Sequence, residues 1–173
     1  MEIIEGPFGL RFIKIEAVQI LLGTNKGAWV YASERPRHRV DLPEFMITES
    51  PLTKAQYAEI LGEKEDSNEL KDMITNDDVD KISKILSQHF EHEVRRPSQA
   101  EWKAAESQIT LPCGWTELLA DEATGNHRGA SLDGRPRLGE MIGPMSGHRV
   151  SQSAPYPRGG LRPSCNSWRQ TSP

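Results

Sequence analysis

The sequence VRRPSQAEWKAA, residues 94–105, carries the most explicit structural signal of the chain. Ser98 and Glu101 have the S-x-x-E spacing of a capping box, in which each side chain accepts a hydrogen bond from the backbone amide of the other residue. Pro97 precedes the cap, and Trp102 adds one large aromatic among small alanines. The pattern predicts a short helix that begins after Ser98 and packs tightly against the rest of the fold.

The sequence before this stretch predicts strands followed by helices. Residues 8–22 are mostly apolar and β-branched, which is typical of one or two strands, and residues 45–47 continue a further strand. Thr53 has the position of an N-cap, and Gly62 that of a helix stop. A second helix is expected to run from a cap at Asp77 or Asp78 to Phe90, because its apolar residues recur at helical spacing.

Length and charge exclude several classes of protein. The chain has 173 residues and a net charge of −4, which argues against nonspecific binding of nucleic acid by the whole surface. No apolar run approaches the roughly 20 residues of a membrane span. The first residues, MEIIE, lack the basic and apolar regions of a signal peptide. We therefore expect a cytoplasmic protein, or one that reaches the cell surface by a non-classical route.

The composition changes along the chain. All eight lysines lie within residues 1–103, and residues 141–173 contain no Lys, Asp or Glu. Residues 104–173 are rich in glycine and proline, which favours short strands between ordered loops over long regular elements. Strands, then helices, then a loop-rich region that packs back on them predict an α+β fold.

Several segments, in order along the chain, resemble the formylglycine-generating-enzyme family, also called sulfatase-modifying factors. They are RPRHRV at residues 35–40, FMI at 45–47, SPLTKAQY at 50–57, RRPSQAEW at 95–102, GWTE at 114–117, HRGAS at 127–131 and GLR at 160–162. The resemblance covers about residues 8–163. It implies a C-type-lectin-like α+β fold in a single domain, residues 1–173, with a helical and acidic insertion at about residues 63–92.

The chemistry of that family is only partly represented here. Its oxidising members hold copper with two cysteines near the C-terminus, where this chain has only Cys165. The other cysteine, Cys113, lies in a different segment, and two free thiols are expected in a reducing compartment. His89 and His92 have the spacing of a helical metal pair, although they are more typical of a polar helix end. We expect no catalytic residue, metal or cofactor; the alternative is a copper- or iron-dependent oxidase of this family.

The same fold serves without catalysis in the variable proteins of diversity-generating retroelements. Their mutagenic process rewrites adenine-rich codons and cannot produce Lys, Glu, Met, Gln or Trp. Residues 123–139 and 153–167 contain none of these five residue types. The resemblance therefore implies a non-catalytic module that binds a ligand or a protein through a diversified C-terminal face.

The predicted contact positions all lie in the loop-rich region, where side chains can vary without loss of the fold or can make adaptable contacts. They are Leu132, Asp133, Arg135, Arg137, Ser151, Ser153, Tyr156, Arg158 and Asn166. Each of them is also typical of a solvated loop. The expected partner is a protein or a small molecule of unknown identity, and not a nucleic acid. A structural docking domain that uses the helix at residues 78–90 is a further alternative.

Overall fold

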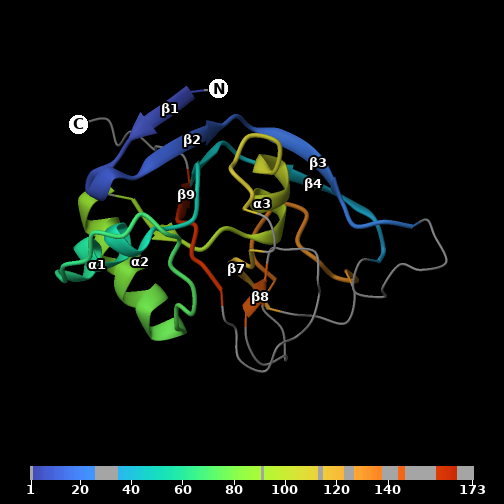
Figure 1. Ribbon diagram of the computed structural model, residues 1–173. Helices are drawn as coiled ribbons and strands as arrows, with labels where there is room; N and C mark the ends of the chain where they lie inside the picture. Colours follow the sequence, from blue (N-terminus) through green and yellow to red (C-terminus); the bar gives the residue numbers. More distant parts are fainter. Residues whose placement is uncertain are drawn as a thin grey trace.

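The computed structural model describes residues 2–25, 35–90, 92–112, 115–122, 127–137, 144–146 and 159–166. Its centre is an antiparallel sheet made of β1 (Glu2–Glu5), β2 (Arg11–Ile15), β5 (Phe45–Thr48), β9 (Ser164–Asn166) and β6 (Val94–Arg95), in that spatial order (Figure 1). Two antiparallel pairs are formed by β3 (Val18–Leu22) with β4 (His38–Leu42), and by β7 (Leu118–Glu122) with β8 (Pro144–Ser146). The α+β architecture predicted from the sequence is confirmed.

Strand β5 is buried on both faces and separates two apolar cores. Phe45 and Ile47 contribute to the core that contains Trp102, whereas Met46 contributes to the core that contains Phe90. Side chains alternate between the two faces of a strand, so each core receives every second residue. A strand covered on both faces reads as a continuous apolar run, which is why FMI was recognisable in the sequence.

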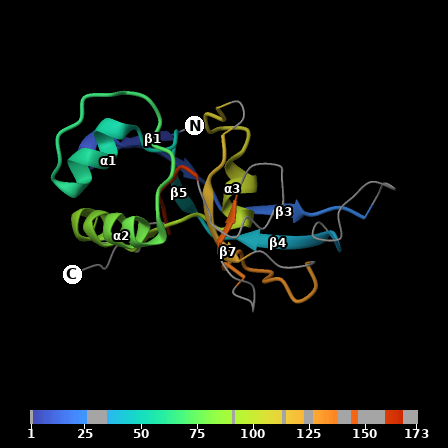
Figure 2. The same ribbon diagram turned by 60° about the horizontal axis from the view of Figure 1, so that its bottom comes forward.

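The helices cover these faces from two directions. Helix α1 (Lys54–Leu61) and helix α2 (Asn76–Phe90) lie together at one end of the molecule. Helix α3 (Gln99–Ala105) lies near the middle, beside the β3–β4 pair (Figures 1 and 2). Within the described residues, no helix has the length and apolar character that crossing a membrane requires.

The helix ends follow the predicted capping chemistry, with one correction. Thr53 caps α1 within a full capping box, and Gly62 ends that helix in the left-handed conformation, with φ +77°. The cap of α2 was predicted at Asp77 or Asp78, but the helix begins at Asn76 and Thr75 precedes it. The Thr75 Oγ1 atom accepts a hydrogen bond from the Asp78 amide at 3.2 Å, and the Asp78 carboxylate accepts one from the Thr75 amide. The side chains of Thr75 and Asp78 therefore each bond the backbone amide of the other residue. The prediction considered only the aspartates as caps, and Thr75 stands directly before the helix.

The stretch around Ser98 folds as predicted. The Ser98 hydroxyl accepts a hydrogen bond from the Glu101 amide, and Glu101 Oε2 accepts one from the Ser98 amide at 2.8 Å. The same carboxylate accepts two hydrogen bonds from Arg95, at 2.8 and 2.7 Å. Glu101 is 4% exposed, so this bidentate pair joins β6 to the start of α3 in a largely dry environment.

A second arginine, Arg162, lies at the centre of the fold and is completely buried. Its Nε and Nη2 atoms donate to the Glu117 carboxylate at 2.8 and 2.7 Å. The remaining N–H groups donate to three backbone carbonyls, those of Thr48, Glu49 and Thr110, at 2.7, 2.7 and 2.8 Å. All five guanidinium donors are therefore satisfied. The indole of Trp102 donates to the same carboxylate at 2.9 Å, which links α3 to this centre.

The buried pair generates a stability prediction. Replacing Glu117 with glutamine removes the negative charge opposite the buried Arg162, and breaking a pair of this kind costs about 3–5 kcal/mol of unfolding free energy. Urea unfolding of Glu117→Gln against the unchanged chain measures this loss.

The matched control is Glu69→Gln. Glu69 pairs with Lys54 on the surface, its side chain is 75% exposed, and pairs of this kind contribute less than about 1 kcal/mol. Equal losses in the two variants would contradict a central role for the Arg162–Glu117 pair.

Candidate ligand-binding face

The longest described part of the predicted binding region is the loop formed by residues 127–137, which runs alongside β4 (Figure 2). Its backbone is bonded to the framework near both ends and in the middle. The His127 amide donates to the Arg35 carbonyl at 2.5 Å, and the Asp41 amide in β4 donates to the Leu132 carbonyl at 2.8 Å. These bonds fix the path of the loop whatever side chain stands at position 132.

Asp121 in β7 is a framework residue that no sequence pattern singled out. Its carboxylate accepts hydrogen bonds from the Gln99 amide at 2.6 Å and from the Arg137 amide at 2.8 Å. It is 8% exposed, and burial raises the pKa of this carboxyl group. One buried side chain thus holds both the first turn of α3 and the end of the loop.

Gly134 supplies the closest approach between the loop and β4. A Cβ atom at this position would lie 2.1 Å from Leu42 Cδ2, and φ is +79°. Both features favour glycine, because other residues rarely adopt a positive φ and the neighbouring Leu42 is itself buried. The loop backbone therefore packs directly against a buried residue of the core at Gly134.

The side chains of the loop point outward where the backbone is anchored. Leu132 is 62% exposed, and the side chains of Asp133 and Arg135 are 56% and 84% exposed. Arg135 Nε lies 3.0 Å from Asp133 Oδ2, and Asp133 also bonds Ser131 and the Arg135 amide. The loop presents an apolar group beside two opposite charges, on a backbone held by other residues.

The structure places four of the predicted contact positions in this loop, one in the central sheet, and the remaining four lie outside the described residues. Leu132, Asp133, Arg135 and Arg137 belong to this loop. Asn166 lies in β9, where its backbone position is opposite Phe45 in the central sheet. Ser151, Ser153, Tyr156 and Arg158 lie outside the described residues.

Two histidines meet at the base of the loop. The ring of His127 contacts the ring of His38 in β4, with ring centroids 5.1 Å apart and planes at 88°. Burial, with smaller contributions from His38 and Arg137, lowers the pKa of His127 to about 4. The imidazole is therefore neutral at pH 7. Both histidines lie in segments that resemble the family, yet nothing in the sequence predicted their contact.

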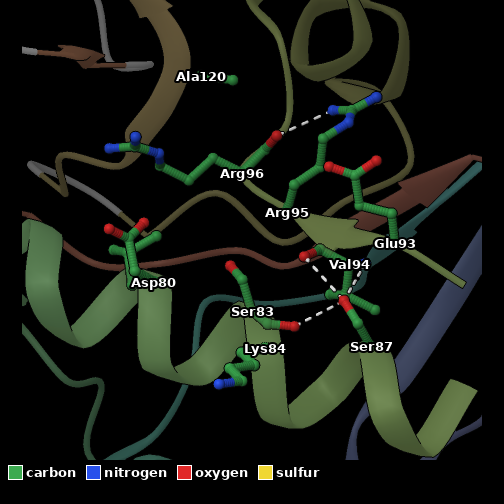
Figure 3. A pocket seen from close by; sticks show the side chains of 10 residues that line it. Asp80, Ser83, Lys84, Ser87, Glu93, Val94, Arg95, Arg96 and Ala120 are labelled. Atoms are coloured by element: carbon green, nitrogen blue, oxygen red, sulfur yellow. Dashed lines mark hydrogen bonds between the residues drawn. The ribbon is translucent and has the colours of Figure 1, made fainter.

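A separate cavity of about 350 Å³ lies between α2 and the segment that includes β6 (Figure 3). Figure 3 shows the Arg96 side chain reaching across it toward Asp80, with Ser83 and Ser87 on the helix below. Arg96 donates one hydrogen bond, to Asn76 Oδ1 at 3.1 Å, and no carboxylate oxygen of the described residues lies within ion-pair distance of it. Lining charges of both signs make it a polar cavity.

The groups considered for metal chemistry are placed apart. Cys165 is a free thiol in β9 and is fully buried, and burial raises the pKa of this thiol to about 12. Cys113 lies outside the described residues. His89 packs edge-on against Phe8, with ring centroids 5.0 Å apart. Among the described residues, no three His, Cys, Asp or Glu side chains form a group that could hold a metal ion.

The anchoring of the loop predicts which positions tolerate change. The double variant Leu132→Ser/Arg135→Ser should unfold within about 0.5 kcal/mol of the unchanged chain, because both side chains are exposed. Gly134→Ala should lose about 1–3 kcal/mol, because it combines a positive φ with a contact in the core. Urea unfolding of the three proteins measures both effects. A larger loss in the double variant than in Gly134→Ala would show that the exposed side chains hold the loop.

Comparison with known proteins establishes the fold. No model of a protein family matches the chain, and no curated protein matches it. The solved structure of PvdO from Pseudomonas aeruginosa is similar, with a TM-score of 0.73 and 16% identity over 96% of this chain and 98% of that chain. Variable protein 1 of Treponema denticola is similar with a TM-score of 0.65 and 13% identity, over 91% and 95% of the two chains. The chain has a C-type-lectin-like α+β fold, as predicted.

Proposed function

We propose that this protein is a non-catalytic binding module whose recognition face includes the loop of residues 127–137. The observation that carries the proposal is the separation of anchors from exposed side chains. The anchors are the Leu132 carbonyl, the Arg137 amide, Gly134 and the buried carboxylate of Asp121. None of them uses the side chain of Leu132, Asp133 or Arg135.

The exposed groups suit recognition of a protein surface or of a polar small molecule. Arg135 offers a planar group with several donors, and its ion pair with Asp133 is exposed enough to be exchanged for a partner's charge. Leu132 adds an apolar contact beside these charges. Because the backbone is already fixed, little conformational entropy is lost when a partner binds.

The proposal extends to diversification of the retroelement type. Support comes from the residue types at 123–139 and 153–167, which lack Lys, Glu, Met, Gln and Trp, and from the shared fold of a protein described as a variable protein. A fold with fixed anchors is compatible with such a process, since altered side chains at the exposed positions leave the framework bonds in place.

An oxidase of the formylglycine-generating type fits the described residues less well. The resemblance to that family rests on scaffold segments, among them the Ser98 capping box and the GLR segment that contains Arg162. Cys165 belongs to the central sheet, with no exposed surface and a raised pKa, so it resists forming the thiolate that ligates Cu(I). The chain therefore resembles that family in its scaffold segments more than in the residues that bind copper.

Binding is tested by capture. The immobilised full chain is exposed to soluble and surface fractions of the source organism, and each captured molecule is purified for a titration. We expect the Leu132→Ser/Arg135→Ser variant to bind at least tenfold more weakly, because it removes the apolar contact and the guanidinium together.

The matched control is Met73→Ser/Lys81→Ser, which removes one exposed apolar side chain and one cation near α2. It should bind like the unchanged chain. Unchanged affinity in the loop variant, with the folded state intact, would contradict the proposed face.

Diversification is tested separately by DNA sequencing. A gene for a reverse transcriptase and a near-copy of the coding segment for the C-terminal region should lie beside the gene. Sequences from independent isolates should differ chiefly at exposed positions of residues 131–166, and not at Gly134 or Asp121. A complete genome without the near-copy would exclude the retroelement mechanism while leaving the binding function open.

A further inference from the structure

The histidine pair at the base of the loop contains two nitrogen atoms that the packing leaves without partners. His38 Nε2 and His127 Nδ1 are both buried, and among the described residues neither has a hydrogen-bond partner. His127 as a whole is only 8% exposed. A buried polar atom without a partner loses its hydration without compensation, so two such atoms on contacting rings require an explanation.

The hydrogen bonding of His38 fixes the state of its ring. Nδ1 lies 3.2 Å from the Pro36 carbonyl oxygen, which can only accept. Nδ1 therefore carries the hydrogen in the neutral ring, and Nε2 has a free lone pair. Histidines that bind a metal through one ring nitrogen typically donate a hydrogen bond from the N–H of the other to a carbonyl or a carboxylate. The second unpartnered nitrogen, His127 Nδ1, lies on the ring that contacts His38.

The separation of the rings fits shared coordination. Two imidazoles that bind one zinc ion at about 2.1 Å in tetrahedral geometry have ring centroids roughly 5 Å apart. The centroids of His38 and His127 are 5.1 Å apart. Coordination also requires that the rings, which now meet edge to face, turn so that Nε2 and Nδ1 point at the same ion.

We infer that His38 Nε2 and His127 Nδ1 form a binding site for a divalent transition metal ion. Neutral imidazole ligands suit zinc, copper and nickel, and do not suit magnesium or calcium. No third His, Cys, Asp or Glu of the described residues completes a cluster with the pair, so water fills the remaining positions. The positive charge of Arg137, which acts on His127, opposes a dication. The affinity is therefore expected to be lower than that of a structural site with four protein ligands.

The site would join two parts of the fold. His38 belongs to β4, and His127 begins the loop whose amide is bonded to Arg35. A metal ion between them would fasten the loop at its first residue, next to the exposed side chains discussed above. The site does not depend on whether the loop binds a ligand, and its test does not use one.

The test is calorimetric titration of the metal-free full chain with zinc chloride. We expect one zinc ion per chain. His38→Asn retains a donor near the Pro36 carbonyl and removes the Nε2 atom, and His127→Gln likewise removes the Nδ1 atom. Each variant should bind zinc at least tenfold more weakly. The control is His89→Gln/His92→Gln, which removes the other histidine pair and should leave the affinity unchanged.

A measurement on the unchanged chain covers the case in which a variant fails to fold. In histidine-labelled protein, zinc should shift the nitrogen resonances of His38 Nε2 and His127 Nδ1. Absence of zinc binding, shifts confined to other histidines, or loss of binding in the His89/His92 variant instead would overturn the site.

Discussion

Arg162 has no exposed surface, and all five of its N–H groups are bonded to the protein. It joins the end of β5, the segment that follows α3 at Thr110, and Glu117, the residue before β7. Trp102 links α3 to the same Glu117 carboxylate. A buried guanidinium is tolerated only with full hydrogen bonding and an opposite charge, and Glu117 provides that charge. Lysine has three donors on a flexible stem, so it could not supply five hydrogen bonds in these fixed directions. The arrangement of strands and helices around the centre thus depends on one residue pair.

The parts of the fold that sequence reasoning reached are those set by local chemistry. The Ser98 capping box, the Thr53 cap and the Gly62 stop each depend on residues within a few positions, and all three are present. The Arg162–Glu117 pair spans 45 residues, and the Asp121 contacts span 22 and 16. Such pairs follow from the packing of distant segments, which periodicity and composition do not encode. Strand β1 was also not predicted, since EIIE is short and has an acid at each end.

In the candidate binding face, too, local features were predictable and contacts between distant residues were not. The loop position of Leu132, Asp133 and Arg135 followed from composition and from the family resemblance, whereas their role in binding stays a prediction. The residues that hold the loop, Asp121 and Gly134, were not singled out, and the contact of His38 with His127 was not foreseen. Gly134 carried one usable signal, because a glycine between polar residues suggests a constrained turn. The histidine contact carried none, since the two residues lie far apart in sequence and meet only in the folded chain.

The position of β9 has a consequence for synthesis of the chain. Residues 164–166 insert between β5 and β6, and Arg162 bonds a carbonyl 114 residues earlier. The central sheet therefore cannot be completed until this late segment has left the ribosome. Contacts between such distant residues slow folding, because a long loop must close before they form. During that interval β5 has an unpaired edge, which is open to pairing with another chain. The time for which this edge stays open depends on how quickly β9, a strand of three residues, pairs with β5.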